Sequence, residues 1–122
     1  MQLTECYRRG IFSPCNQEAE DQLRSWYVDH PLLVYFISLN NDDDFYGLWD
    51  LKVFDKINGL CDSMIDDYEE ELIEPDKLYL IVRLIDQEYQ NVSSPSLKIF
   101  FKSFRELLEK AIANQKPVFF IF

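Results

Sequence analysis

The C-terminal stretch Ser94–Phe122 reads SPSLKIFFKSFRELLEKAIANQKPVFFIF and gives the clearest indication of the fold. Ser94 and Pro95 have the form of a helix start, an N-cap hydroxyl followed by proline at the first helical position. A polar break at 114–116 precedes PVFFIF at 117–122, which predicts a terminal strand. Between them, apolar residues recur at the three- and four-residue steps of one helical face: Leu97, Phe100, Phe101, Phe104, Leu107, Leu108, Ala111 and Ile112.

Two apolar runs upstream predict further strands. Leu32–Leu39 (LLVYFISL) is continuous, contains β-branched and aromatic residues, and is closed by the turn signal Asn40-Asn41-Asp42. Lys77–Ile85 (KLYLIVRLI) is rich in Leu, Ile and Val, and a polar loop follows it at 86–93. Both runs have the length of strands buried within a sheet.

Helical patterns fill the segments between these runs. Ser13-Pro14 repeats the helix-start signal, and the apolar spacing beyond it predicts a helix at 14–28 that ends at Asp29-His30-Pro31. From Asp55 the apolar spacing is helical again, which predicts a helix over 55–74 with one apolar stripe: Ile57, Leu60, Cys61, Met64, Ile65, Tyr68 and Leu72. Glu74-Pro75-Asp76 should end that helix, because proline cannot continue it.

Residues 45–54 leave two interpretations open. Trp49, Leu51 and Val53 alternate with charged residues, which favours a strand, whereas the alternative is an early start of the next helix. The overall alternation of helices and strands favours an α/β fold with parallel strand pairs. We expect one globular domain spanning 1–122, with a single small three- or four-stranded sheet, parallel or mixed, covered by about three helices.

The excess negative charge lies in one region, residues 42–76, called here the acidic stretch. It holds thirteen acids against two bases, a net charge of −11, whereas the other 87 residues carry nine acids and ten bases. The rest of the chain has a net charge of +1, so the chain's net charge of −10 comes from this stretch alone. Direct binding to nucleic acid or anionic lipid needs a basic footprint, so we expect neither, and the partner should be a basic protein.

Catalytic and metal-binding motifs are missing from the sequence. It contains no nucleophile elbow, no glycine-rich phosphate loop and no cysteine pair at metal-ligand spacing, and its single histidine, His30, stands at an expected helix end. We expect no enzyme activity, no cofactor and no metal. Three cysteines favour free thiols in a reducing compartment, and neither a secretory signal nor a membrane span is recognised. We therefore expect a cytoplasmic protein.

A helical projection of 55–74 places acids opposite the apolar stripe. Asp62, Asp66 and Glu69 or Glu70 form a column one turn apart, and such like charges cost an isolated helix about 0.2–0.5 kcal/mol each. A solvated face is one interpretation of this column, and a surface for a basic partner is the other. Aromatic residues beside the acids favour the second, because Trp and Tyr are common interface anchors. The candidate partner-binding residues are Asp42, Asp43, Asp44, Tyr46, Trp49, Asp62, Asp66, Asp67, Glu69 and Glu70.

The chain resembles the small acidic immunity proteins of bacterial toxin systems, such as those that protect against contact-dependent growth inhibition toxins. Its helix–strand alternation is also similar to that of barstar-type inhibitors. The resemblance covers the whole chain in size, charge and order of elements, without a diagnostic motif. It implies a 1:1 inhibitor that covers the active site of a basic toxin, often a nuclease, with carboxylates in the positions of substrate phosphates. We expect a monomer or weak dimer.

Two other functions remain alternatives. A nucleic-acid mimic would inhibit DNA-binding proteins, because carboxylates one helical turn apart, about 6 Å, roughly match the spacing of phosphates along a strand. Such a mimic should inhibit several unrelated DNA-binding proteins and lose affinity steeply with salt. An immunity protein should instead neutralise one toxin, and a non-catalytic adaptor should inhibit nothing.

Overall fold

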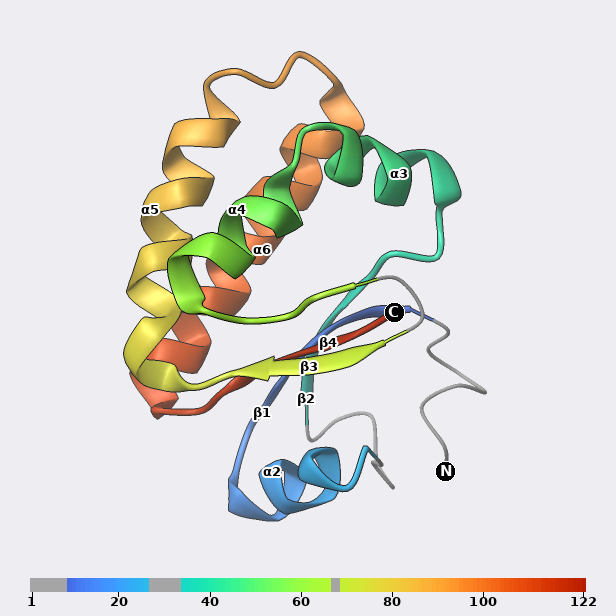
Figure 1. Ribbon diagram of the computed structural model, residues 1–122. Coiled ribbons are helices and arrows are strands. Elements are labelled where there is room, and N and C mark those ends of the chain that lie inside the picture. Colours follow the sequence, from blue (N-terminus) through green and yellow to red (C-terminus); the bar gives the residue numbers. More distant parts are fainter. Residues whose placement is uncertain (1–8, 27–33, 67–68) are drawn as a thin grey trace.

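An antiparallel sheet forms the centre of the fold (Figure 1). The computed structural model describes residues 9–26, 34–66 and 69–122. Within these residues the sheet has four strands, each antiparallel to its neighbours. In spatial order they are β2 (Val34–Ser38), β1 (Gly10–Pro14), β4 (Val118–Ile121) and β3 (Glu70–Ile73). The α/β class is confirmed, and the parallel or mixed sheet is wrong.

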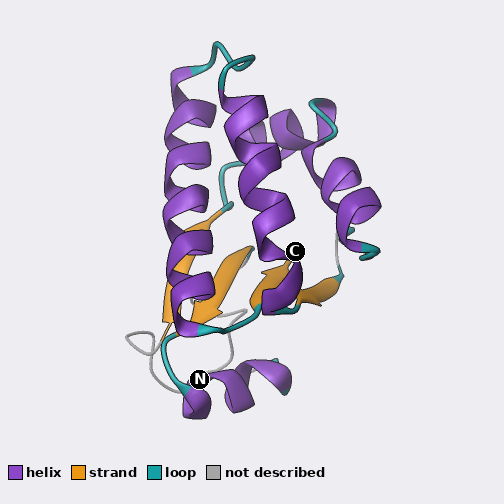
Figure 2. Cartoon of the chain, turned by 90° about the vertical axis from the view of Figure 1, so that its left-hand side faces the viewer, coloured by secondary structure: helices purple, strands orange, loops and turns teal. Residues whose placement is uncertain are grey.

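Helices lie on both faces of this sheet (Figures 1 and 2). One face is covered by α3 (Asp42–Asp50), α4 (Val53–Cys61), α5 (Leu78–Tyr89) and α6 (Pro95–Asn114). The other face carries α2 (Gln17–Arg24). The described part of the chain thus has five α-helices rather than about three, with a short 3-10 turn at Pro75–Lys77 before α5.

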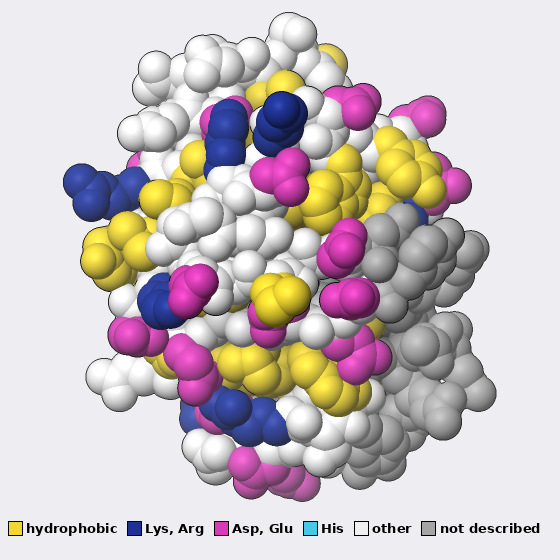
Figure 3. Space-filling model, viewed as in Figure 1, with side chains coloured by type: hydrophobic (Ala, Val, Ile, Leu, Met, Phe, Trp, Pro, Cys, Tyr) yellow, Lys and Arg dark blue, Asp and Glu magenta, His cyan; other side chains and the backbone are white. Residues whose placement is uncertain are grey.

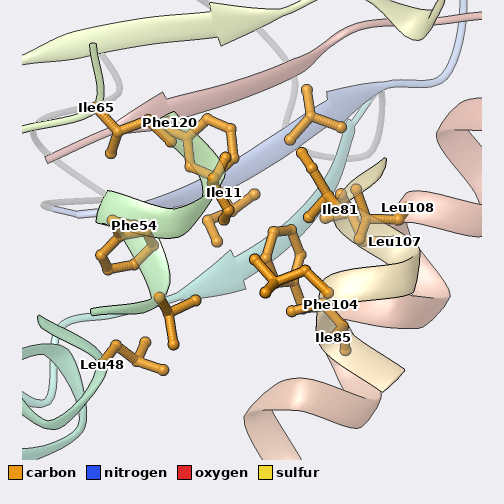
Figure 4. Packing of buried hydrophobic residues seen from close by; sticks show 14 of the residues in the cluster. Ile11, Leu48, Phe54, Ile65, Ile81, Ile85, Phe104, Leu107, Leu108 and Phe120 are labelled. Atoms are coloured by element: carbon orange, nitrogen blue, oxygen red, sulfur yellow. The ribbon is translucent and has the colours of Figure 1, made fainter. Parts of the chain in front are cut away.

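The two helical layers bury opposite sides of the same strands. Ile11 and Phe120 lie in the larger core, where side chains from α4, α5 and α6 converge on the sheet (Figure 4). Phe12 and Phe119, their neighbours along β1 and β4, instead pack with Leu23 of α2. Successive side chains of a strand point to opposite faces, so adjacent apolar residues in these two strands allow helices to cover both sides.

The helix expected at 14–28 is shorter and begins later. Ser13 and Pro14 belong to β1, where the Ser13 hydroxyl donates to the Pro117 carbonyl at 3.2 Å. Asn16 is the true N-cap, because its side-chain oxygen accepts the Ala19 N–H at 2.9 Å. Residues 27–33, which hold the expected helix end and His30, lie outside the described residues.

The run at 77–85 is a helix, not a strand. Leu78, Ile81 and Ile85 are buried at helical spacing in α5, which continues through part of the expected loop as far as Tyr89. A short, continuous apolar run does not distinguish a buried strand from a buried helix. Pro75, interpreted as a helix terminator, instead stands at the first position of the 3-10 turn that leads into α5.

The acidic stretch folds into several short elements. Residues 45–50 belong to α3 and residues 53–54 to α4, with a turn at 51–52, so the favoured strand is wrong and the helical alternative is closer to the structure. The helix expected over 55–74 ends at Cys61, where Asp62 takes a left-handed backbone with φ 53° and caps it. Asp adopts this conformation more readily than most residues. Residues 70–73 then form β3, an edge strand of the sheet.

Three expected elements are confirmed. α6 starts after the Ser94 cap, whose hydroxyl oxygen accepts the Leu97 N–H at 3.4 Å. β2 lies within the predicted strand 32–39, of which residues 32 and 33 are outside the described residues, and β4 lies within 117–122. Among the described residues, no helix has the length and apolar character needed to cross a membrane.

Candidate functional site

The first turn of α3 carries three successive aspartates. The dipole of the helix favours carboxylates at this end. Arg9 donates to Asp42 at 2.6 Å, and the Ser96 hydroxyl donates to the Asp44 carboxylate at 2.7 and 2.8 Å. Asp43 is exposed and makes no hydrogen bond or ion pair with the described residues through its side chain. Two of these aspartates therefore support the fold, and Asp43 is accessible to a partner.

The outer face of α3 extends this acidic surface. Asp43, Tyr46 and Asp50 are spaced at i, i+3 and i+7, which places them on one side of the helix, and Tyr46 is 49% exposed. Trp49 is only partly exposed, and its ring packs against Phe54 at a centroid distance of 4.9 Å. Of the two aromatic residues proposed as anchors, Tyr46 is the accessible one.

A second group of acids surrounds β3 at the edge of the sheet. Glu71 is engaged within the fold, since its carboxylate accepts the backbone N–H of Met64 at 2.8 Å and that of Leu72 at 2.9 Å. Glu74 accepts from Arg24 of α2 at 2.9 Å. Glu71 thus connects β3 to the preceding turn, and Glu74 connects the end of β3 to α2. Neither carboxylate is free for contacts with a partner.

Other carboxylates near α4 and β3 point into solvent. Within the described part of the chain, the following are exposed and their side chains have no hydrogen bond or ion pair: Asp55, Asp62, Glu69, Glu70 and Asp76. Asp66 is exposed as well, and Asp67 lies outside the described residues. On the surface of the acidic stretch, a few carboxylates are thus bonded within the fold, and a larger number are accessible to Lys or Arg side chains of a partner.

The predicted column of acids on one helical face is wrong. Asp62 caps α4, Asp66 follows in a turn, and Glu70 begins β3, with Glu69 just before it. The spacing of one helical turn therefore does not apply to these residues. They share instead a position in the segment that leads from α4 along the edge of the sheet.

Basic residues within and next to the acidic stretch neutralise it only in part. Lys56 donates to Glu88 at 2.6 Å, and Lys77 donates to the Cys61 carbonyl at 2.8 Å. Lys52 is exposed between α3 and α4. Figure 3 shows Asp and Glu side chains spread over the face that carries α3, α4 and β3, with hydrophobic side chains among them.

A polar cavity of about 320 Å³ opens beside this edge. It is lined by Cys61, Asp62, Ser63, Glu71, Leu72, Ile73, Glu74, Asp76 and Lys77. Burial raises the pKa of the Cys61 thiol, which keeps it protonated and unreactive at neutral pH. In the described residues, no group of His, Cys, Asp and Glu side chains is arranged to hold a metal ion. Four carboxylates and one lysine line the cavity, so its charge is predominantly negative.

No protein-family model matches this sequence, and no curated protein matches it. The chain is similar in structure to the Neisseria DNA mimic protein DMP12. The similarity has a TM-score of 0.60 and covers 93% of this chain and 99% of that chain, at 16% sequence identity. At this identity, the likeness to DMP12 establishes the fold.

The likeness to DMP12 corrects the resemblance drawn from size, charge and element order. The assignment to immunity proteins of contact-dependent growth inhibition systems, or to barstar-type inhibitors, is wrong, and so is the predicted inhibition of a bacterial toxin or nuclease. The order of elements behind that assignment was itself incorrect at 45–54, 55–74 and 77–85, and it lacked the strand β1 before the first helix. The acidic surface was compatible with both an immunity protein and a nucleic-acid mimic, so it could not distinguish them.

The sequence pattern also missed accessible parts of this surface. Asp50, Asp55 and Asp76 are exposed but were not among the candidates. Leu60 and Met64 were assigned to an apolar helical stripe, yet they are 46% and 75% exposed. For Met64 the spacing suggested burial because the helix was expected to continue beyond residue 61, whereas Leu60 lies within α4 and is exposed there. No signal in the apolar pattern marks the cap that ends it.

Proposed function

We propose that this chain is a non-catalytic DNA mimic that binds the DNA-binding surface of a basic protein and keeps nucleic acid away from it. The observation that carries the proposal is the set of exposed carboxylates without internal partners on the face of α3, α4 and β3. The similarity in fold to a protein described as a DNA mimic supports it.

The exposed carboxylates of this surface can bind the same basic side chains as the phosphates of DNA. Double-stranded DNA presents one negative charge per roughly 1.7 Å of helix axis, and DNA-binding proteins contact its phosphates with Lys and Arg. Carboxylates accept charge-assisted hydrogen bonds from the same side chains, including bidentate ones from Arg. The net charge of −11 in the acidic stretch also attracts a basic partner over a distance and speeds the encounter.

The absence of an internal partner matters because a paired carboxylate would have to break its ion pair before binding. Glu69 and Glu70 are exposed beside β3, whereas Glu71 and Glu74 are held by hydrogen bonds within the fold. Contacts to a partner should therefore be made by the unpaired set. Asp43, exposed in the first turn of α3, also belongs to this unpaired set.

The test is a displacement experiment. A lysate of the native host is loaded on DNA-cellulose at about 0.1 M salt, and the column is washed with this protein at constant salt. We expect basic DNA-binding proteins in the eluate, to be identified by mass spectrometry. Fluorescence anisotropy with a labelled duplex and each purified eluted protein should then show competition that weakens steeply as salt rises.

Two variants of equal charge separate a specific surface from bulk acidity. The triple variant D62N/E69Q/E70Q removes three unpaired carboxylates beside α4 and β3. The control E18Q/D21N/E106Q removes the same types of charge from α2 and α6. The first should compete at least about tenfold less well, and the control should match the wild-type chain. Equal loss in both variants, or no elution by the wild-type chain, would refute the proposal.

A further inference from the structure

A turn of residues 63–65, directly after α4, is held by hydrogen bonds from two side chains. The side-chain oxygen of Asn58 accepts from the Ser63 hydroxyl and from the Ile65 N–H, both at 2.8 Å, and its amide donates to the Ile65 carbonyl at 3.0 Å. Glu71 fixes the intervening residue by accepting the Met64 N–H at 2.8 Å. Hydrogen bonds from both sides therefore define the conformation of this turn.

This rigid turn projects one large apolar side chain into solvent. Ile65 is only 4% exposed and packs in the larger core, whereas Met64 is 75% exposed. Leu60, in the last turn of α4, is 46% exposed. Hydrophobic side chains stand among Asp and Glu side chains on this face of the molecule (Figure 3). Exposed Asp62 and Asp66 stand two residues before and after Met64, so the fold positions Met64 within the acidic surface and uses it little for its own packing.

We infer that Met64 is an apolar anchor of the interface, and that the partner is a DNA-binding protein whose basic surface includes an exposed apolar patch. This inference rests on the proposed function. Charge complementarity places Lys and Arg side chains around Asp62 and Glu70, and the long aliphatic parts of those side chains pack well on an apolar surface. A thioether adapts its shape to such a contact.

Preorganisation makes this contact efficient. An exposed methionine on a mobile loop would lose conformational freedom when it is covered, whereas the hydrogen bonds of Asn58 and Glu71 already hold the backbone of the turn. The apolar contact adds affinity that does not depend on salt, next to ionic contacts that do. The apolar contact also makes binding selective, because a basic protein without an apolar patch would gain affinity only from the ionic contacts.

The experiment compares two kinds of variant against the purified protein that the wild-type chain elutes from DNA-cellulose. The dissociation constant is measured by calorimetry at several salt concentrations between about 0.05 and 0.5 M. Met64→Ala should raise the dissociation constant about tenfold at every salt concentration. The slope of the logarithm of the dissociation constant against the logarithm of the salt concentration should stay unchanged. D62N/E69Q/E70Q should reduce the slope. Met64→Leu should restore affinity, and Ile112→Ala, which alters an apolar residue 39% exposed on α6, should have no effect.

Methionine NMR gives an independent measurement. The chain contains two methionines, Met1 and Met64, so its ¹³C-methyl spectrum is simple, and Met64→Leu assigns the signal. We expect the Met64 methyl to shift when the eluted protein is added. An unchanged Met64 signal, or an affinity unaltered by Met64→Ala at all salt concentrations, would overturn the inference while leaving the DNA mimic intact. A chain that elutes no DNA-binding protein would overturn both.

Discussion

Glu71 holds Met64 in place by accepting its backbone N–H at 2.8 Å. The second oxygen of the same carboxylate accepts the N–H of Leu72, in the edge strand β3, at 2.9 Å. Unpaired N–H groups on an edge strand invite pairing with other chains. One acid of the acidic stretch therefore satisfies a backbone N–H of the edge strand and also fixes a turn.

Replacing Glu71 should destabilise the protein. Glu71→Ala leaves two backbone N–H groups without their carboxylate acceptor, one exposed and one partly buried, and we expect a loss of about 1–2 kcal/mol in the free energy of unfolding. Glu70→Ala, which removes an exposed carboxylate without an internal partner, should stay within about 0.5 kcal/mol of the wild-type value. Urea unfolding followed by circular dichroism measures both. Equal stabilities would contradict the structural role of Glu71.

Asp50 should show a conflict between stability and binding. It is exposed at the C-terminal end of α3, where no basic residue offsets it and where the helix dipole disfavours an anion. Asp50→Asn should therefore raise the free energy of unfolding by about 0.3–1 kcal/mol. The same change should weaken competition with DNA for the eluted partner. A variant that is both less stable and equally competitive would show that Asp50 has a structural role instead.

The sequence predicted α6 and β4 well because several signals agreed there. Ser94 supplies the cap, Pro95 the first position, and the apolar period persists along the helix. β1 and β3 gave no such signal. Gly10 and Glu70 both pair with Ile121 across the sheet, so these short strands are specified by the partner strand β4 rather than by their own composition.

The location of the negative charge was predictable, and the roles of individual acids were not. Asp42 and Asp43 are equivalent in the sequence, yet only Asp42 pairs with Arg9, a residue 33 positions away. Glu70 and Glu71 differ in the same manner. The Glu71 carboxylate accepts the N–H of Met64, which lies in a turn where the sequence predicted a helix, whereas the Glu70 carboxylate makes no such bond. Contacts between distant segments decide which carboxylates are left for a partner.

Stability should fall in acid partly through Glu20. Burial raises its pKa, but hydrogen bonds from Lys116 and Arg24, at 3.0 and 2.9 Å, outweigh burial and lower the pKa below its ordinary value. A lowered pKa means that the folded state binds the proton less readily than the unfolded state. Its stabilising contribution is therefore complete above the ordinary pKa of about 4.3, and it is lost as the pH falls through the lowered one.

The matching variant is Glu20→Gln. It should be less stable than the wild-type chain at pH 7, and the difference should shrink as the pH falls below about 4. Urea unfolding at pH 7, 5 and 3 measures the difference. Glu18→Gln, at an exposed position in the first turn of the same helix, should show a smaller dependence. A constant difference between Glu20→Gln and the wild-type chain across this range would contradict the assignment.

Two glycines should respond to alanine in opposite directions. A Cβ atom at Gly10 would lie 2.3 Å from a ring carbon of Phe36 and 2.6 Å from the Ile37 carbonyl oxygen, so β1 and β2 would have to separate. We expect Gly10→Ala to cost about 1–3 kcal/mol. Gly59 lies within α4 with nothing within 4 Å of such an atom, and Gly59→Ala should stabilise the helix by about 0.5–1 kcal/mol. Urea unfolding of the pair compares them directly. A neutral Gly10→Ala would mean that the two strands are not packed as closely as this register requires.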